Sequence, residues 1–120
     1  MVRLLGLVLK NLEGEAVPLS DIVVLTPARA DRSALRRRGR INGYELSSEP
    51  EPGKVLACTI HGFKGLERPV VILAEIGERH PEDLARYLYV GGSRARNHLI
   101  VLATEPVARQ LRALAGVASA

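Results

Sequence analysis

The sequence is poor in the residues that support several common classes of small protein. Its 120 residues include one cysteine, no tryptophan, three tyrosines and one phenylalanine. The single cysteine, Cys58, excludes an internal disulfide and fits a reducing compartment, so we expect a cytoplasmic location. Aromatic residues make up only 3% of the chain, which leaves little surface for stacking nucleic-acid bases.

Long apolar runs and a phosphate-binding loop are also missing. No apolar stretch approaches the roughly 20 residues that a membrane-spanning helix needs, so no membrane segment is expected. The pattern G-x-x-x-x-G-K-[ST], whose amides and lysine cradle the phosphates of a nucleotide, occurs nowhere in the sequence. No apolar strand is followed by an acidic pair, and no metal-ligand pattern stands out. The chain alone is therefore not expected to bind ATP tightly, to hydrolyse it, or to hold a metal.

Positive charge is in excess. Seventeen Lys and Arg residues face thirteen Asp and Glu residues, which gives a net charge of +4 and a pI of about 9.7. Such a balance favours a polyanionic partner. The bias towards arginine also arises from genome base composition, and many charges simply solvate a surface. Charge alone does not distinguish a nucleic-acid-binding surface from a solvated one.

Short apolar segments alternate with amphipathic segments along the chain. The patterns predict strands at residues 22–25, 55–60, 69–76 and 99–103, and helices at 4–14, 31–38, 82–90 and from 106 onward. A small hairpin is expected at residues 40–46 around Asn42-Gly43, a favoured two-residue turn. Since the strands are apolar on both faces, we expect a single α/β domain spanning residues 1–120, with a doubly wound, mainly parallel sheet flanked by helices.

The most informative stretch is T-I-H-G-F-K-G-L-E at residues 59–67, where the second predicted strand ends. Its two glycines permit tight turns and a close approach of the backbone to a ligand. Thr59 and His61 alternate along the strand end, and Glu67 is an acceptor suited to a sugar hydroxyl. The simpler alternative is a connection whose glycines serve geometry and whose glutamate caps backbone amides.

A second stretch, Y-V-G-G-S-R-A-R-N-H-L at residues 89–99, leads into the last predicted strand. We expect its G-G-S sequence to break the preceding helix and to expose Arg94. The planar, permanently charged guanidinium of arginine matches phosphate, and it stabilises charge that develops during phosphoryl transfer. Arg96 lies two residues further on and is expected to face elsewhere. Alternatively, both arginines pair with acidic groups or solvate a loop.

The two stretches are expected to share one place in the fold. Ligands of doubly wound sheets bind at the carboxyl ends of the strands. We therefore expect residues 59–67 and 91–96 to lie together along that edge.

In this order, the two stretches resemble motifs V and VI of the UvrD/Rep-type superfamily 1 DNA helicases, which read T-x-H-x-x-K-G-L-E and Y-V-x-x-[ST]-R-A-[RK]. The resemblance is tight over residues 55–104 and looser over residues 20–38. It implies the second, C-terminal RecA-like (P-loop NTPase-type) domain of a helicase, in a compact form. Such a domain encloses ATP with Mg²⁺ in a cleft with an N-terminal RecA-like domain that carries the P-loop. Single-stranded DNA runs across both domains.

The resemblance also assigns roles to individual residues. Arg94 matches the arginine finger that reaches the γ-phosphate, which makes it the catalytic candidate. Glu67 matches a glutamate near the ribose, and Gly65 matches the backbone turn beside it, so these two join Arg94 as ATP-binding candidates. Thr59, His61 and Arg29 are the DNA-binding candidates.

The sequence also departs from the family pattern. Motif IV is not recognisable before residue 20, and the insert that family members often carry is reduced to a short loop at about residues 38–54. The resemblance therefore implies half of an ATP site, which includes the arginine finger and lacks the phosphate-binding P-loop. We expect the C-terminal motor domain of an ATP-dependent DNA helicase. Two alternatives stay open: a stand-alone nucleic-acid-binding module and a structural module with vestigial motifs.

Overall fold

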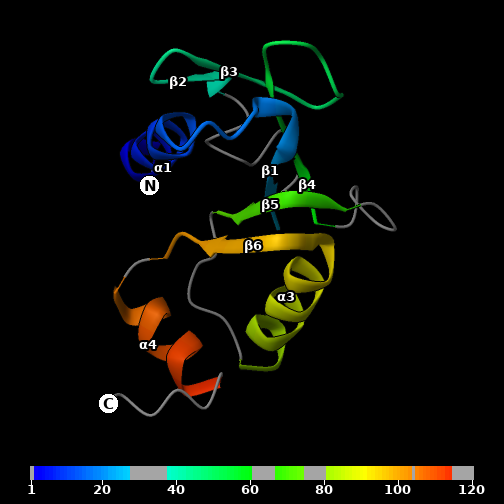
Figure 1. The fold of residues 1–120 in the computed structure, drawn as a ribbon. Coiled ribbons are helices and arrows are strands. Elements are labelled where there is room, and N and C mark those ends of the chain that lie inside the picture. Colours follow the sequence, from blue (N-terminus) through cyan, green and yellow to red (C-terminus); the bar gives the residue numbers. More distant parts are fainter. Residues whose placement is uncertain (1, 28–37, 61–66, 75–80, 104, 115–120) are drawn as a thin grey trace.

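The described part of the chain forms a sheet of six strands, five of which are neighbours that run parallel. The computed structural model describes residues 2–27, 38–60, 67–74, 81–103 and 105–114 (Figure 1). The strands are β1 (Ile22–Thr26), β2 (Arg40–Ile41), β3 (Tyr44–Ser47), β4 (Val55–Thr59), β5 (Arg68–Leu73) and β6 (Ala95–Val101). Their order is β2-β3-β4-β1-β5-β6, and every neighbouring pair is parallel except β2 with β3. This topology confirms the expected α/β class with a mainly parallel sheet.

Helices cover both faces of the sheet. Helix α1 (Val2–Gly14) lies on one side, whereas α3 (Pro81–Arg94) and α4 (Glu105–Leu114) lie on the other (Figure 1). A short 3-10 turn, η1 (Leu19–Asp21), leads into β1. The arrangement is the doubly wound one that alternating strands and helices predict.

Strand β1 shows why these residues form a central strand. All five of its residues are buried, since successive side chains point to opposite faces and both faces are covered. Ile22 and Val24 pack with Leu5 and Leu9 of α1, whereas Val23 packs on the opposite side, in the cluster that α3 and α4 cover. Each fully buried side chain of this size contributes roughly 1.5–3 kcal/mol.

The predicted hairpin is confirmed. Asn42 (φ 51°) and Gly43 (φ 87°) both adopt the left-handed conformation between β2 and β3. Two consecutive left-handed residues make the type I′ turn whose twist matches that of the flanking strands.

Two predicted boundaries near the second motif are wrong. The helix continues through the two glycines to Arg94, four residues beyond its predicted end, and β6 begins at Ala95 instead of residue 99. The early part of β6 is exposed at Arg96, Asn97 and His98. Because β6 is an edge strand, it tolerates polar residues that an apolar pattern does not detect.

Gly91 has a packing role that accounts for the longer helix. A Cβ atom built at Gly91 would lie 2.7 Å from Cδ1 of Leu73 on β5. Gly91 itself is buried, so α3 approaches the sheet at the distance that only glycine allows. Gly91 therefore lets α3 pack against the sheet, and the helix continues through both glycines.

The helix predicted at residues 31–38 lies outside the described residues, except for Arg38. Among the helices that the structure describes, none is both long and apolar enough to cross a membrane.

Candidate functional site at the two ends of the sheet

The strand register places the candidate residues at opposite ends of the sheet. Thr59, the last residue of β4, pairs with Thr26 at the carboxyl end of β1. Arg68 and Ala95 pair at the amino ends of β5 and β6, so Glu67 and Arg94 directly precede two paired residues. The expectation that residues 59–67 and 91–96 share the carboxyl edge is therefore wrong. The length of β5, six residues, separates the two ends by about 20 Å.

The reason for this division is the path of the chain. Residues 59–67 begin at the carboxyl end of β4 and must return to the amino end of β5, because these strands are parallel. Helix α3 makes the same return before β6. The start of the first stretch and the end of the second therefore cannot share one end of the sheet.

Arg94 is the last residue of α3, and its side chain is half-buried. Its Nε atom is buried and has no hydrogen-bond partner among the described residues. The hydroxyl of Ser93, one residue earlier, donates to the carbonyl oxygen of Val90 over 2.7 Å and so belongs to the helix. A buried donor without a partner is costly, and such groups are rare in folded proteins. The fold therefore buries the Arg94 side chain as far as Nε, and this N–H group is still able to donate a hydrogen bond.

Glu67 lies beside this arginine along the sheet end but does not neutralise it. The two residues flank the paired Arg68 and Ala95, and Glu67 is exposed. Within the described part of the chain, neither side chain takes part in an ion pair with the other. One acceptor and one cation are therefore both available to a ligand at the amino end.

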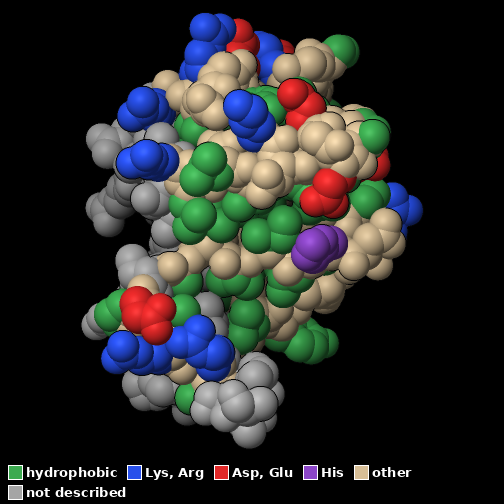
Figure 2. All heavy atoms as spheres, turned by 60° about the vertical axis from the view of Figure 1, so that its left-hand side comes forward, with side chains coloured by type: hydrophobic (Ala, Val, Ile, Leu, Met, Phe, Trp, Pro, Cys, Tyr) green, Lys and Arg blue, Asp and Glu red, His purple; other side chains and the backbone are tan. Residues whose placement is uncertain are grey.

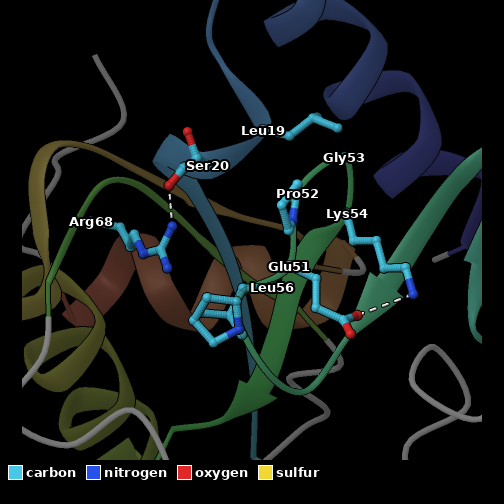
Figure 3. Close-up of a pocket in the computed structure, with 9 residues that line it drawn as sticks. Leu19, Ser20, Glu51, Pro52, Gly53, Lys54, Leu56 and Arg68 are labelled. Carbon is cyan, nitrogen blue, oxygen red and sulfur yellow. Dashed lines mark hydrogen bonds and ion pairs between the residues drawn. The ribbon is translucent and has the colours of Figure 1, made fainter.

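An open pocket of about 630 Å³ adjoins this end, where β1, β4 and β5 begin (Figure 3). Its walls come from η1, from the loop between β3 and β4, and from the start of β5. The guanidinium of Arg68 donates to the carbonyl oxygen of Ser20 and ties η1 to β5. The lining residues are Leu19, Ser20, Pro50, Glu51, Pro52, Gly53, Lys54, Leu56 and Arg68.

The charges around the pocket are largely paired with one another. Lys54 lies 3.1 Å from Glu51 and 3.5 Å from Glu45, and Glu45 lies 2.6 Å from Arg40. The hydrogen bond from Arg40 lowers the pKa of Glu45, and the hydrogen bond from Lys54 lowers the pKa of Glu51. The same contact with Glu51 raises the pKa of Lys54. The pocket therefore offers mainly apolar surface between neutralised charges.

The carboxyl end of the sheet has a different character. Thr26 is fully buried, and its carbonyl oxygen accepts a hydrogen bond of 2.9 Å from the amide of Ile60. Ala74 and Leu102 are buried as well. Thr59 is half-buried and is the one DNA-binding candidate that the structure describes. His61, Gly65 and Arg29 lie outside the described residues.

Two residues with structural roles at the site were not singled out in the sequence. Arg68 anchors η1, and Gly91 sets the distance of α3 from the sheet. The signal for Arg68 was its place directly after Glu67, at the first residue of an apolar strand. The signal for Gly91 was a glycine pair inside an otherwise helical pattern, which we assigned to a helix end.

Arg96, two residues after Arg94, lies on β6 and is exposed. Within the described segments, no group of three or more His, Cys, Asp or Glu side chains is placed to hold a metal ion.

Comparison with known proteins identifies one family. The model of the UvrD-like helicase C-terminal domain matches residues 54–102, which include both sequence motifs, strands β4 to β6 and helix α3. The resemblance stated from the two motifs is therefore confirmed. A comparison with curated proteins gave no significant match.

Proposed function

We propose, from the match of residues 54–102 to the UvrD-like helicase C-terminal domain, that the chain acts as a helicase motor domain whose Arg94 completes an ATP site. The proposed partner is an N-terminal RecA-like domain that carries the P-loop, since this sequence has none. The proposed substrate is single-stranded DNA. Without that partner domain, the chain is not expected to hydrolyse ATP.

The buried, unpartnered Nε atom of Arg94 is the observation that carries the proposal. It lies at the amino end of the sheet next to Glu67, an exposed acceptor. An anionic oxygen would satisfy the arginine, and a sugar hydroxyl would satisfy the glutamate. A nucleotide supplies both groups, so the residues present fit it.

Arg94 would act when the cleft between the two domains closes. Bound ATP with Mg²⁺ supplies the phosphoryl group that is transferred to water. The fold holds the base of the arginine side chain through packing of α3, which reduces the entropy lost when the guanidinium meets a phosphate. Charge develops on the phosphoryl oxygens during transfer, so the contact is strongest in the transition state.

Thr59 would contact the DNA backbone from the other end of the sheet. We propose that its end of β4 forms part of the DNA track, together with His61 and Arg29, which lie outside the described residues. The two ligands would then bind about one strand length apart. Closure of the cleft at the amino end would move a DNA contact at the carboxyl end.

Replacement of the finger tests the proposal. In the helicase that joins this domain to its N-terminal partner, Arg94→Ala is expected to lower ATP turnover at least ~100-fold and to leave nucleotide binding largely intact. Arg94→Lys should restore little, because an ammonium cannot reproduce the planar fork. ATPase kinetics and titration with a fluorescent nucleotide separate the two effects.

Arg96→Ala is the matched control, since it removes the same charge two residues away on an exposed strand position. It should retain most of the turnover. Near-normal hydrolysis by Arg94→Ala would show that the finger assignment is wrong.

A further inference from the structure

A second hollow lies away from both ends described above, between helix α1 and the β2–β3 hairpin. It has a volume of about 560 Å³. Its lining residues are Arg3, Gly6 and Leu7 of α1, Arg38, and Ile41 and Asn42 of the hairpin. Figure 2 shows Lys and Arg side chains on this part of the molecule and, around an acidic side chain, on α4. We refer to the hollow as the α1–hairpin groove.

Among its described lining residues, the groove carries two positive charges and no negative one. None of its lining residues is acidic, and both Arg3 and Arg38 are exposed. Neither arginine has an ion pair or a side-chain hydrogen bond among the described residues. Two cations on one groove without a counter-charge produce a positive field that attracts anions.

Three other arginines on the surface differ from Arg3 and Arg38 because each has a carboxylate partner. Arg109 and Arg112 lie 3.4 Å and 3.1 Å from the same carboxylate oxygen of Glu105 on α4. Arg40, next to the groove in sequence, lies 2.6 Å from Glu45. These three positive charges are therefore neutralised locally, whereas those of Arg3 and Arg38 are not.

The walls of the groove belong to regular structure. A Cβ atom at Gly6 would lie 3.0 Å from Cβ of Asn42, so α1 packs closely against the hairpin turn. Ile41 is buried beneath, with 1% of its surface exposed, whereas Leu7 is 54% exposed. The groove thus combines a fixed shape, an apolar surface and a cationic rim, which suits an anionic chain with apolar groups between its charges.

We propose that the α1–hairpin groove binds the sugar-phosphate backbone of single-stranded nucleic acid. Arg3 and Arg38 would each contact a phosphate, Leu7 would pack against a sugar, and the Asn42 amide would donate to an oxygen between them. None of the lining residues that the structure describes is aromatic, so the contact would be led by phosphate and would show little base preference. The site lies outside the Thr59 contact proposed above and stands independently of it.

Salt dependence of DNA binding tests this assignment. The isolated chain would be titrated with a fluorescently labelled oligothymidylate at a series of salt concentrations, followed by anisotropy. The slope of log K against log salt reports the number of phosphates that the protein contacts, at about 0.7 per contact on a single strand. The double variant Arg3→Ala/Arg38→Ala is expected to reduce that slope by about 1.4 and to weaken binding most at low salt.

The matched control is Arg109→Ala/Arg112→Ala, which removes the same two charges from α4. It should leave the slope nearly unchanged. An equal reduction of the slope in both double variants would assign binding to net charge and overturn the proposal. An unchanged slope in Arg3→Ala/Arg38→Ala would also overturn it. So would the absence of DNA binding by the wild-type chain at low salt.

Three further measurements separate the groove from the Thr59 contact and from a loss of folding. Arg3→Lys/Arg38→Lys should retain most of the slope, and thermal unfolding should show that each variant is folded. Thr59→Val should weaken DNA binding without changing the slope, since it removes no charge. If only Thr59→Val weakens DNA binding, the proposed role of the groove is wrong and the Thr59 contact is supported. If only Arg3→Ala/Arg38→Ala weakens binding, the groove is supported and the Thr59 contact is wrong.

A competing anion distinguishes nucleic acid from acidic peptides. Binding of labelled polyglutamate that is lost in Arg3→Ala/Arg38→Ala, with an unchanged DNA slope in the same variant, would assign the groove to acidic peptides and overturn the proposal. Retention of the oligonucleotide in the presence of polyglutamate, with the reduced slope in the double variant, is the expected result.

Discussion

The two ends of the parallel sheet differ in chemistry. At the carboxyl end, the described residues are small or apolar and buried, such as Thr26, Ala74 and Leu102. At the amino end, charged residues gather where the strands begin, with Glu67 and Arg94 beside the paired start of β5 and β6. Ligands of doubly wound sheets bind at the carboxyl ends as a rule. That rule describes a sheet that builds its own ligand site. Under the function proposed above, this domain would add one arginine to a partner's site and would be free to use the other end.

The two ends of the sheet also differ in the interactions that stabilise them. The carboxyl end continues the backbone ladder beyond the strands, with amides of Ile60, Ala74 and Leu102 donating to the neighbouring strand over 2.9 Å. At the amino end, a side-chain contact from Arg68 to Ser20 ties η1 to β5. Gly91 of α3 packs instead against Leu73, the last residue of β5. The backbone hydrogen bonds should survive single side-chain substitutions, whereas the contacts of Arg68 and Gly91 depend on those residues themselves.

The largest expected effect in this comparison comes from Gly91→Ala. The added methyl group would lie 2.7 Å from Cδ1 of Leu73, so α3 must shift or Leu73 must leave its position. Overpacking of this kind costs about 1–3 kcal/mol, which urea unfolding measures. Gly92→Ala is the control, since its nearest contact would be Leu99 at 3.9 Å. That exposed helical position should gain about 0.5–1 kcal/mol.

Leu73→Ala sharpens this prediction through a double-mutant cycle. The substitution removes the side-chain atoms that the new methyl group would meet, so Gly91→Ala should cost much less in that background. Additive losses of stability would show that contact with Leu73 does not determine the packing of α3.

A smaller effect, on DNA affinity, is expected from substitution of Thr59 at the end of β4. Thr59→Val keeps the shape of the side chain and removes its hydroxyl, and loss of one hydrogen bond of about 1 kcal/mol predicts a roughly fivefold weaker affinity for single-stranded DNA. Glu67→Gln, at the amino end, should not weaken DNA binding. Anisotropy titrations of both variants compare the two ends directly, and a greater loss of affinity in Glu67→Gln would reverse their proposed roles.

The smallest expected effect is on the pH dependence of thermal stability. The pKa values of Glu45 and Glu51 are lowered in the folded chain by hydrogen bonds from Arg40 and Lys54. A lowered folded-state pKa stabilises the fold above the unfolded-state pKa, and this contribution is lost as the pH falls through the folded-state value. Glu45→Gln should therefore reduce the difference in Tm between neutral and acidic pH only slightly, because these side chains are solvated. A large change would show that the pair is more important than its exposure indicates.

Much of the fold could be predicted from the sequence because its signals are local. The apolar run at Ile22–Leu25, the Asn42-Gly43 turn and the alternation of strands and helices each depend on a few neighbouring residues. The two motifs are local as well, and they identified the helicase family that the family model confirms over residues 54–102. The side chains with candidate chemistry, Glu67 and Arg94 among them, could be named before the structure was known.

Only the tertiary structure decided where these residues lie relative to one another. The sequence placed both motifs at one edge, but parallel strands oblige each connection to cross the sheet, which separates Thr59 from Glu67 and Arg94. The glycine pair was expected to end a helix, and contact with Leu73 instead allows the helix to continue. Neither result can be derived from neighbouring residues, since both depend on contacts between segments far apart in the chain. Local sequence determined which groups this domain presents, and long-range packing determined which of them share a site.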